Sequence, residues 1–210
     1  MSTAREVTSA LRRIASPERA LVSKRFFKTG KGEYGEGDVF IGVTVPEQRE
    51  IALRFRALPL TEIKKLLRSK IHEERLTALI ILVGQFERGS KKERTHIVKF
   101  YLSSTSRINN WDLVDSSARD IVGAYFSDKS KKILYKLARS KNIWERRIAV
   151  VATHYFIGEG KHNDTFVIAK MLLSDTEDLI HKATGWMLRE AGKKDRKQLA
   201  RQVRSKFEKQ

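Results

Sequence analysis

The hydrophobic and polar positions of residues 60–210 nowhere alternate as they would in a β-strand. All three prolines, Pro17, Pro46 and Pro59, lie before this stretch, so helices can run through it without a break. Short separators rich in Gly, Ser, Asn and Asp divide it into segments of helical length. The pattern predicts an all-α protein, with helices over residues 61–68, 72–87, 91–103, 110–126, 131–140, 143–156, 164–173, 177–191 and 196–206.

Two further helices are predicted before residue 60. Ser16 followed by Pro17 is typical of a helix start, with a hydroxyl cap and a proline at the first helical position. Pro46 similarly opens a helix that we expect to reach about Leu58.

Residues 29–38 form a glycine-rich exception that matches the spacing G-x-G-x-x-G. We reject a nucleotide-binding loop here, because the segment follows a helical pattern and its acids would repel phosphate. A flexible connection is the better interpretation, with Tyr34 either packing or touching a ligand. Residues 39–43 are then expected to return to the core.

The predicted helices come in pairs with a loose repeat. Aligning Arg75, Asp115, Arg147 and Lys182 on the second helices gives spacings of 40, 32 and 35 residues. Such a period indicates an α-solenoid of HEAT-like helix pairs whose second helices line a concave basic face. We expect one domain over residues 1–210, ending in a basic helix over residues 193–210. An irregular helical bundle is the alternative.

The composition adds a strong charge preference. The chain has 43 Lys and Arg against 25 Asp and Glu, a net charge of +18 and a pI near 10.2. This favours a polyanionic partner, which could be DNA, RNA or an acidic membrane surface. The chain has no long apolar run, no recognisable signal sequence and no cysteine, so a soluble cytoplasmic monomer is expected, associated with the nucleoid when it acts on DNA.

The chemistry that the sequence can support is restricted. The five histidines show no HExxH or similarly tight metal-ligand spacing, and neither G-x-S-x-G nor a P-loop is present. No metal or organic cofactor is therefore expected. What remains is carboxylate chemistry with aromatic and cationic support.

The segment around Trp111 is the most informative candidate site. Trp111 and Asp115 are four residues apart, so a helix would place an aromatic plate beside a carboxylate on one face. That pair suits a cationic ligand. Asp112 is better explained by electrostatics at a helix start, where Asn109 or Asn110 could supply the cap.

Other candidates lie later in the chain. Trp144 is interpreted as a core residue, whereas Gly185 beside Trp186 indicates the close approach of a neighbour or a ligand. Arg147 could clamp a phosphate with two hydrogen bonds, and neighbouring cations could line the same groove. A solvated face, or ion pairs with Glu145 or Asp178, is the alternative. The cations and the aromatic residue predicted to contact DNA are Arg146, Lys182, Arg189 and Tyr34.

These segments together resemble the AlkD-like DNA alkylation repair family, whose members are DNA glycosylases built from HEAT-like repeats. The resemblance rests on WDLVD at residues 111–115, NIWERRIA at 142–149, IHKATGWMLRE at 180–190 and FIGVTVPEQR at 40–49. Asn110 departs from the pattern, since some members have a second tryptophan there. The glycine-rich segment is also longer than in some members.

The resemblance implies specific roles. The family's catalytic aspartate falls on Asp115, its sugar-contacting tryptophans on Trp111 and Trp186, and its arginine on Arg147. It implies hydrolysis of the N-glycosidic bond of cationic alkylpurines, such as 7-methylguanine and 3-methyladenine, in duplex DNA without base flipping. A catalytically inactive HEAT-type nucleic-acid-binding module is the alternative.

Overall fold

The computed structural model describes residues 2–196 and residue 200, and this part of the chain is helical without any strand. Its only β-type pairing is an isolated parallel bridge between Val39 and Ile71. The prediction of an all-α protein is therefore confirmed. The chain forms two compact units, Met1–Ser117 and Ala118–Gln210; one domain over residues 1–210 stays a prediction.

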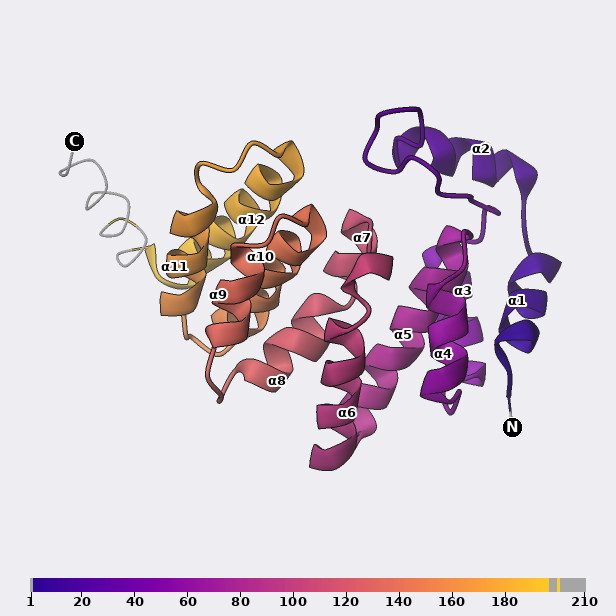
Figure 1. The fold of residues 1–210 in the computed structure, drawn as a ribbon, viewed down its shortest axis with the longest axis horizontal. Coiled ribbons are helices and arrows are strands. Elements are labelled where there is room, and N and C mark those ends of the chain that lie inside the picture. The colour runs from indigo at the N-terminus through magenta and orange to yellow at the C-terminus, as the bar shows by residue number, and fades with distance from the viewer. Residues whose placement is uncertain (1, 197–199, 201–210) are drawn as a thin grey trace. The chain divides into compact units, whose positions relative to one another are not determined.

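The N-terminal unit contains seven α-helices and one short 3₁₀ helix among its described residues. In chain order they are α1 (Ala4–Arg13), α2 (Pro17–Phe26), α3 (Val45–Arg54), α4 (Leu60–Leu67), α5 (His72–Arg88), α6 (Lys91–Leu102), η1 (Thr105–Arg107) and α7 (Trp111–Asp115). Helix α5 is the centre of this unit and packs against α1, α3, α4, α6 and α7 (Figure 1).

Local capping explains where several of these helices begin. Thr3 with Glu6 and Ser90 with Glu93 form capping boxes, in which each side chain bonds to the other residue's backbone N–H. The first box starts α1, a helix that the analysis of the sequence did not predict. Ser16 caps α2 ahead of Pro17, as predicted.

The predicted helix over residues 110–126 is wrong as a single element. It divides into α7, a turn at Ser116 and Ser117, the π-helix η2 (Arg119–Gly123) and α8 (Ala124–Phe126). The Ser116 hydroxyl donates to the carbonyl of Asp112 and the Ser117 hydroxyl to the carbonyl of Leu113, both at 2.5 Å. Hydroxyls that bond to carbonyls four residues earlier compete with the helical ladder, which accounts for the break.

The helix that begins at Val45 is shorter than predicted. Helix α3 ends at Arg54, before the predicted Leu58.

In the glycine-rich segment, the Gly30 N–H donates to Glu33 at 2.7 Å and the Gly32 N–H to Glu36 at 2.8 Å. The carboxylates of Glu33 and Glu36 accept the backbone N–H groups that a phosphate would need. This agrees with the rejection of a nucleotide-binding loop. The segment is a series of hydrogen-bonded turns.

Residues 39–43 return to the core as predicted for Phe40 and Val43, which are both buried. The buried carboxylate of Glu73 on α5 holds this segment, accepting the N–H groups of Ile41 and Gly42 at 3.0 and 2.8 Å. Residues 41 and 42 have no strand partner, so the Glu73 carboxylate satisfies their successive backbone N–H groups.

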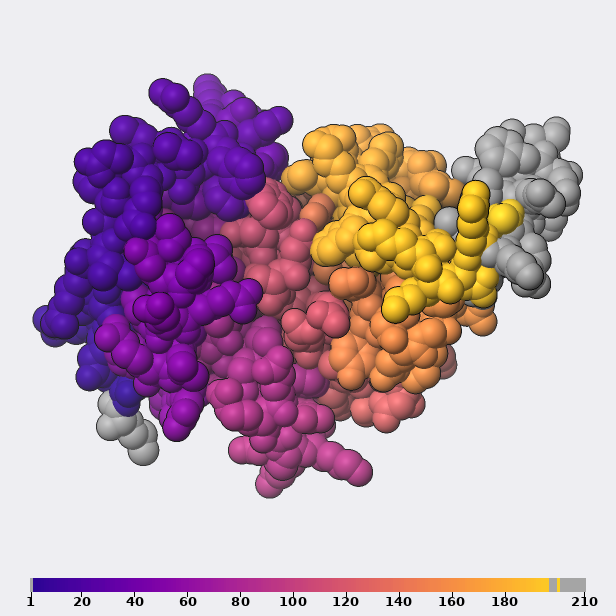
Figure 2. Space-filling model, turned by 180° about the vertical axis from the view of Figure 1, so that it is seen from behind, coloured from indigo at the N-terminus to yellow at the C-terminus, as the bar shows by residue number. Residues whose placement is uncertain are grey.

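The C-terminal unit contains, after η2 and α8, two helix pairs: α9 (Lys132–Ala138) with α10 (Ile143–Gly158), and α11 (Asn163–Leu172) with α12 (Asp178–Lys194). Helix α9 packs on α11 and α10 on α12, so like helices of the two pairs are neighbours, as in a repeat (Figure 1). Seen from behind, α12 covers one face of this unit (Figure 2). A solenoid with a concave basic face stays a prediction.

The predicted basic helix over residues 193–210 falls largely on positions 197–199 and 201–210, which lie outside the described residues. Its first residues, Lys193 and Lys194, end α12.

Gly42 offers a test of the packing between α2 and residues 39–43. Its φ is +78°, and an added Cβ would lie 2.1 Å from the carbonyl oxygen of Ser16 and 2.6 Å from the nitrogen of Ala20. We predict that Gly42→Ala lowers the free energy of unfolding by about 1–2 kcal/mol for the left-handed backbone and by a further ~1–3 kcal/mol for the backbone overlap. Urea denaturation measures both.

Gly32→Ala is the matched control. Gly32 has a similar φ of +79°, but an added Cβ there would meet no described atom within 4 Å. Gly32→Ala should therefore lower the free energy of unfolding only by the amount that comes from the left-handed backbone. Equal losses in the two variants would contradict the close packing of Gly42 on the start of α2.

Candidate active site

Helix α7 presents one buried and one accessible side. Asn110 caps it by accepting the Trp111 N–H at 2.8 Å, which confirms Asn110 as one of the two predicted caps. Leu113 and Val114 are fully buried, whereas Trp111 and Asp115 are partly exposed. Because Trp111 and Asp115 are four residues apart, the short helix carries both on one side.

Trp111 lies at the edge of an aromatic cluster in the N-terminal unit, in which Phe27, Phe40 and the His72 imidazole all contact one another. Its ring is stacked on Phe27, with centroids 5.3 Å apart, and Phe27 is stacked on Phe40 at 4.9 Å. Phe40 in turn is stacked on the imidazole of His72 at 4.6 Å. Phe26 meets the indole edge-on at 5.8 Å. These contacts fix the plane of the indole through several rings.

Tyr34 contacts this aromatic cluster from the glycine-rich segment. The indole Nε1–H of Trp111 donates to the Tyr34 hydroxyl at 3.3 Å, and that hydroxyl lies 3.4 Å from the carbonyl of Phe26. Tyr34 therefore packs within the protein, one of the two roles considered for it. Its predicted contact with DNA stays a prediction.

A buried cluster of charges lies beneath α7. Asp38 contacts His72 Nδ1 at 2.9 Å with one carboxylate oxygen and accepts from Arg75 at 2.6 Å with the other. The opposite ring nitrogen, Nε2, lies 2.7 Å from Asp112. Asn110 donates to Asp38 at 3.1 Å. The members of this cluster come from three separate segments, so no local pattern in the sequence predicted it.

The cluster shifts the acidities of its members. Burial alone would raise the pKa of Asp38, but the His72 hydrogen bond and the Arg75 charge outweigh it, so the pKa is lowered. Burial alone would lower the pKa of His72, but the charge and hydrogen bond of Asp112, with Asp38, raise it. The stability from a raised histidine pKa is fully present below the ordinary value of 6.5 and is lost as the pH rises through the folded value.

Asp115 lies near the buried hydroxyl of Tyr101. Burial raises the pKa of Tyr101, its hydrogen bond with Ser117 offsets part of the rise, and the negative charge of Asp115 adds to it. Tyr101 therefore stays neutral near a carboxylate. The aspartate is neither buried nor fully exposed.

In the C-terminal unit, Trp186 is partly exposed on α12 and its ring is tilted against His154 of α10, with centroids 5.4 Å apart. Burial lowers the pKa of His154 and the Arg119 charge lowers it further, which favours a neutral imidazole beside the indole. An added Cβ at Gly185 would meet no described atom within 4 Å. No described neighbour therefore requires that glycine, and the surface beside the indole is open.

Arg146 of α10 forms an ion pair with Asp175, in the loop before α12. Arg146 donates to Asp175 at 2.6 and 3.1 Å and to the carbonyls of Ser140 and Lys141 at 3.0 and 3.1 Å. Its donors hold the loops that precede α10 and α12. Burial alone would raise the pKa of Asp175, but the Arg146 hydrogen bond and others outweigh it and lower the pKa. The predicted DNA contact of Arg146 stays a prediction.

The other cations of this unit vary in exposure. Arg147 is buried, only 5% exposed, and donates to the carbonyl of Leu179 at 2.5 Å. Lys182 is exposed and pairs with Asp178 at 2.7 Å, the ion pair considered as the alternative for it. Arg189 is exposed on α12. Phosphate binding by these residues stays a prediction. Trp144 is buried, as expected of a core residue.

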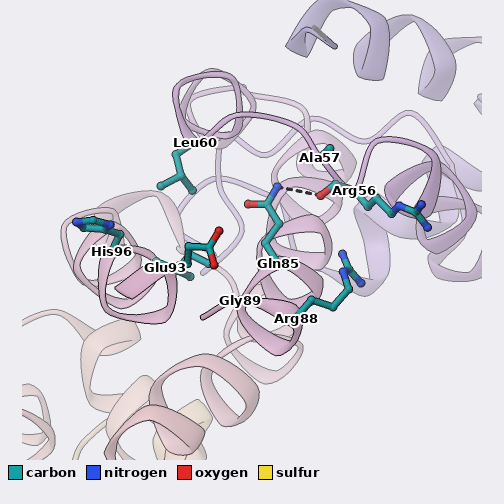
Figure 3. Close-up of a pocket in the computed structure, with 9 residues that line it drawn as sticks. Arg56, Ala57, Leu60, Gln85, Arg88, Gly89, Glu93 and His96 are labelled. Carbon is teal, nitrogen blue, oxygen red and sulfur yellow. Dashed lines mark hydrogen bonds between the residues drawn. The ribbon is translucent and has the colours of Figure 1, made fainter. Parts of the chain in front are cut away.

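A cavity of about 480 Å³ lies elsewhere in the N-terminal unit, at the far end of α5 (Figure 3). Gln85 lines it and donates to the carbonyls of Arg56 and Leu58. Since α5 has 17 residues, its two ends are about 24 Å apart, so this cavity is separate from the cluster around His72.

Within the described residues, no group of three or more His, Asp or Glu side chains is arranged to hold a metal ion. None of the helices in that same part of the chain is both long and apolar enough to cross a membrane.

Comparisons with known proteins define the class of the chain. Residues 7–207 match the family described as DNA alkylation repair enzyme. Among solved structures, the fold is similar to a protein described as a predicted DNA alkylation repair enzyme from Enterococcus faecalis, with a TM-score of 0.69, 19% sequence identity and coverage of 91% of this chain and 89% of that chain. Among curated protein sequences, none matches the chain.

The fold and the family match together assign an all-α helical protein of DNA repair. The chain belongs to the DNA alkylation repair enzyme family. Membership points to DNA as the substrate and confirms the resemblance noted in the sequence.

The ion pair between Arg146 and Asp175 is largely buried. Their side chains are only 14% and 7% exposed. Arg146→Ala should lower the free energy of unfolding by about 3 kcal/mol, because it leaves a buried carboxylate unpaired. Lys182→Ala, on an exposed pair, should leave thermal unfolding nearly unchanged. Calorimetry of both variants makes the comparison; equal stability of Arg146→Ala and wild type would contradict the structural role.

Proposed function

We propose that the protein is a monofunctional DNA glycosylase that releases cationic alkylpurines, including 7-methylguanine and 3-methyladenine, from duplex DNA. The observation that carries the proposal is the accessible side of α7, where a rigidly stacked indole and a carboxylate lie together. Family membership and the net charge of +18 support DNA as the substrate.

The chemistry needs few groups. Alkylation at N3 or N7 places a positive charge on the purine, so the base can leave without an acid that protonates it. The sugar then becomes a cation resembling an oxocarbenium ion. In the proposed mechanism, the Asp115 carboxylate stabilises this cation and orients the water that attacks the anomeric carbon.

Aromatic walls supply further stabilisation. An indole face near a cation contributes about 0.5–2 kcal/mol, and the aromatic cluster behind Trp111 keeps the plane of the indole fixed before the substrate arrives. Trp186 is proposed as a second sugar-contacting indole and Arg147 as a phosphate ligand, the roles that the family resemblance implies. Base release is proposed to occur without base flipping.

Asp115→Asn tests the reaction directly. The amide keeps the size of the side chain but removes its negative charge, so the rate of base release from methylated duplex DNA should fall by a factor of about 10² or more. The measurement is single-turnover release of methylated base, with circular dichroism to confirm the fold. Asp128→Asn, at a 73% exposed carboxylate, is the matched control and should leave the rate unchanged.

Each outcome is decisive. No release by wild-type protein, combined with binding to duplex DNA, would contradict the enzyme and favour the inactive binding module. Release by Asp115→Asn at the wild-type rate would remove the proposed role of that aspartate.

Gly185→Ala tests whether DNA approaches the open surface beside Trp186. Alanine favours the helix by about 1 kcal/mol over glycine, so the free energy of unfolding should rise. The added methyl group should nevertheless weaken lesion binding, raising the KM for methylated duplex several-fold. Gly158→Ala on α10 is the control, since it also meets no described atom within 4 Å. A stabilised Gly185→Ala variant with unchanged KM would contradict close approach there.

A further inference from the structure

His72 faces two carboxylates, one at each ring nitrogen. Nδ1 lies 2.9 Å from Asp38 and Nε2 lies 2.7 Å from Asp112. A neutral imidazole has one donor and one acceptor, whereas an ionised carboxylate can only accept. Two carboxylate partners therefore require a proton on both nitrogens, which is the imidazolium form.

The charges around the ring support that form. The groups facing it are Asp38 from the segment before Phe40, Asp112 from α7, and Arg75 from α5 at 3.5 Å. The stacked rings of Phe27 and Phe40 carry no charge. With His72 protonated, the positive charges of His72 and Arg75 balance the negative charges of Asp38 and Asp112. Without that proton, a buried cluster carries an unbalanced negative charge, which is unfavourable in low dielectric surroundings.

The bridge holds the first turn of α7 at two points. Asp112 contacts His72 with one oxygen and accepts the Leu113 N–H at 2.8 Å with the other. Asn110, the cap of α7, is held by Asp38. A helix of five residues does not persist through its own hydrogen bonds, so its orientation depends on such ties.

We propose that His72 is a positioning residue, which bridges Asp38 and Asp112 through both ring nitrogens and thereby sets the orientation of Trp111 and Asp115 on α7. The inference rests on the proposed glycosylase reaction and adds a residue that acts through α7. It also makes the orientation of α7 sensitive to pH, because the bridge is intact while the ring holds both protons and is lost as pH rises and one leaves.

The bridge itself can be observed in the free protein. In ¹⁵N-labelled protein, one of the five histidines should keep both ring nitrogens protonated above pH 6.5, and this signal should be missing in His72→Gln. In protein labelled with fluorotryptophan, the ¹⁹F signal of Trp111, assigned by its loss in Trp111→Phe, should shift with the same midpoint. His96→Gln, at an exposed histidine on α6, is the matched control and should change neither signal.

Base release then tests the consequence for function. The single-turnover rate of the wild type should fall as the His72 signal titrates. His72→Gln should be slower by a factor of about 10–100 at neutral pH, since small misplacements of reacting groups have effects of that size, and should lose this alkaline fall. The Kd for methylated duplex should change by less than about threefold, because the bridge does not contact DNA in the proposal.

Asp112→Asn keeps the test decisive where His72→Gln fails to fold. Its side chain is 15% exposed and retains an oxygen for the Leu113 N–H, while its charge is removed. Asp112→Asn should shift the ¹⁹F signal of Trp111 and slow base release, as His72→Gln is expected to do. The inference would be overturned if the ¹⁹F signal of Trp111 did not change with pH or in either variant, and if the rate of base release fell only in proportion to the fraction of unfolded protein.

Failure of the reaction is separable from failure of the bridge. Absence of base release by wild type, together with a Trp111 signal that titrates with His72, would contradict the glycosylase and support the bridge. Release by wild type with a His72 ring that is neutral at pH 6.5 would support the reaction and overturn the bridge.

Discussion

The N-terminal unit depends on one imidazole that bonds to two carboxylates. Asp38, His72, Arg75 and Asp112 lie where isolated charges would be strongly disfavoured, and their opposite charges stabilise one another. Removing any one of the four charges leaves the cluster with an unbalanced charge. The cluster therefore joins α5, the last residue of the glycine-rich segment and the first turn of α7 into one interdependent arrangement.

The same imidazole belongs to the aromatic cluster that holds Trp111, because it contacts both Phe27 and Phe40, so polar and aromatic contacts converge on His72. Phe40 is stacked directly on His72, and Phe27 lies between Phe40 and the indole. An aromatic wall fixed in this way requires little reorganisation when a cation forms beside it, which is the condition under which preorganised electrostatics is most effective. Packing and charge thus act on the same short helix.

Helix starts were predictable because caps and prolines act locally: Ser16 with Pro17 and Asn110 before Trp111 were assigned from neighbouring residues alone. The charge cluster was not, because its contacts join residues 34 and 40 positions apart, and periodicity does not say which charges pair. The split of residues 110–126 was missed for a related reason, since two serines there bond to the backbone as well as occupying helical positions. The pairing of Arg146 with Asp175, 29 residues away, likewise has no local signature in the sequence.

The two acids of α7 have different environments, and the difference fits the proposed chemistry. Asp112 is committed to His72 and to the Leu113 N–H, whereas Asp115 shares the partly exposed side of α7 with Trp111. Glycoside hydrolysis with a neutral leaving group needs two carboxyl groups at the bond, one of them protonated. A leaving group that is already cationic needs no proton donor, so one carboxylate at the sugar suffices. The second acid of α7 is then available to hold the helix in place, which is how the structure uses it.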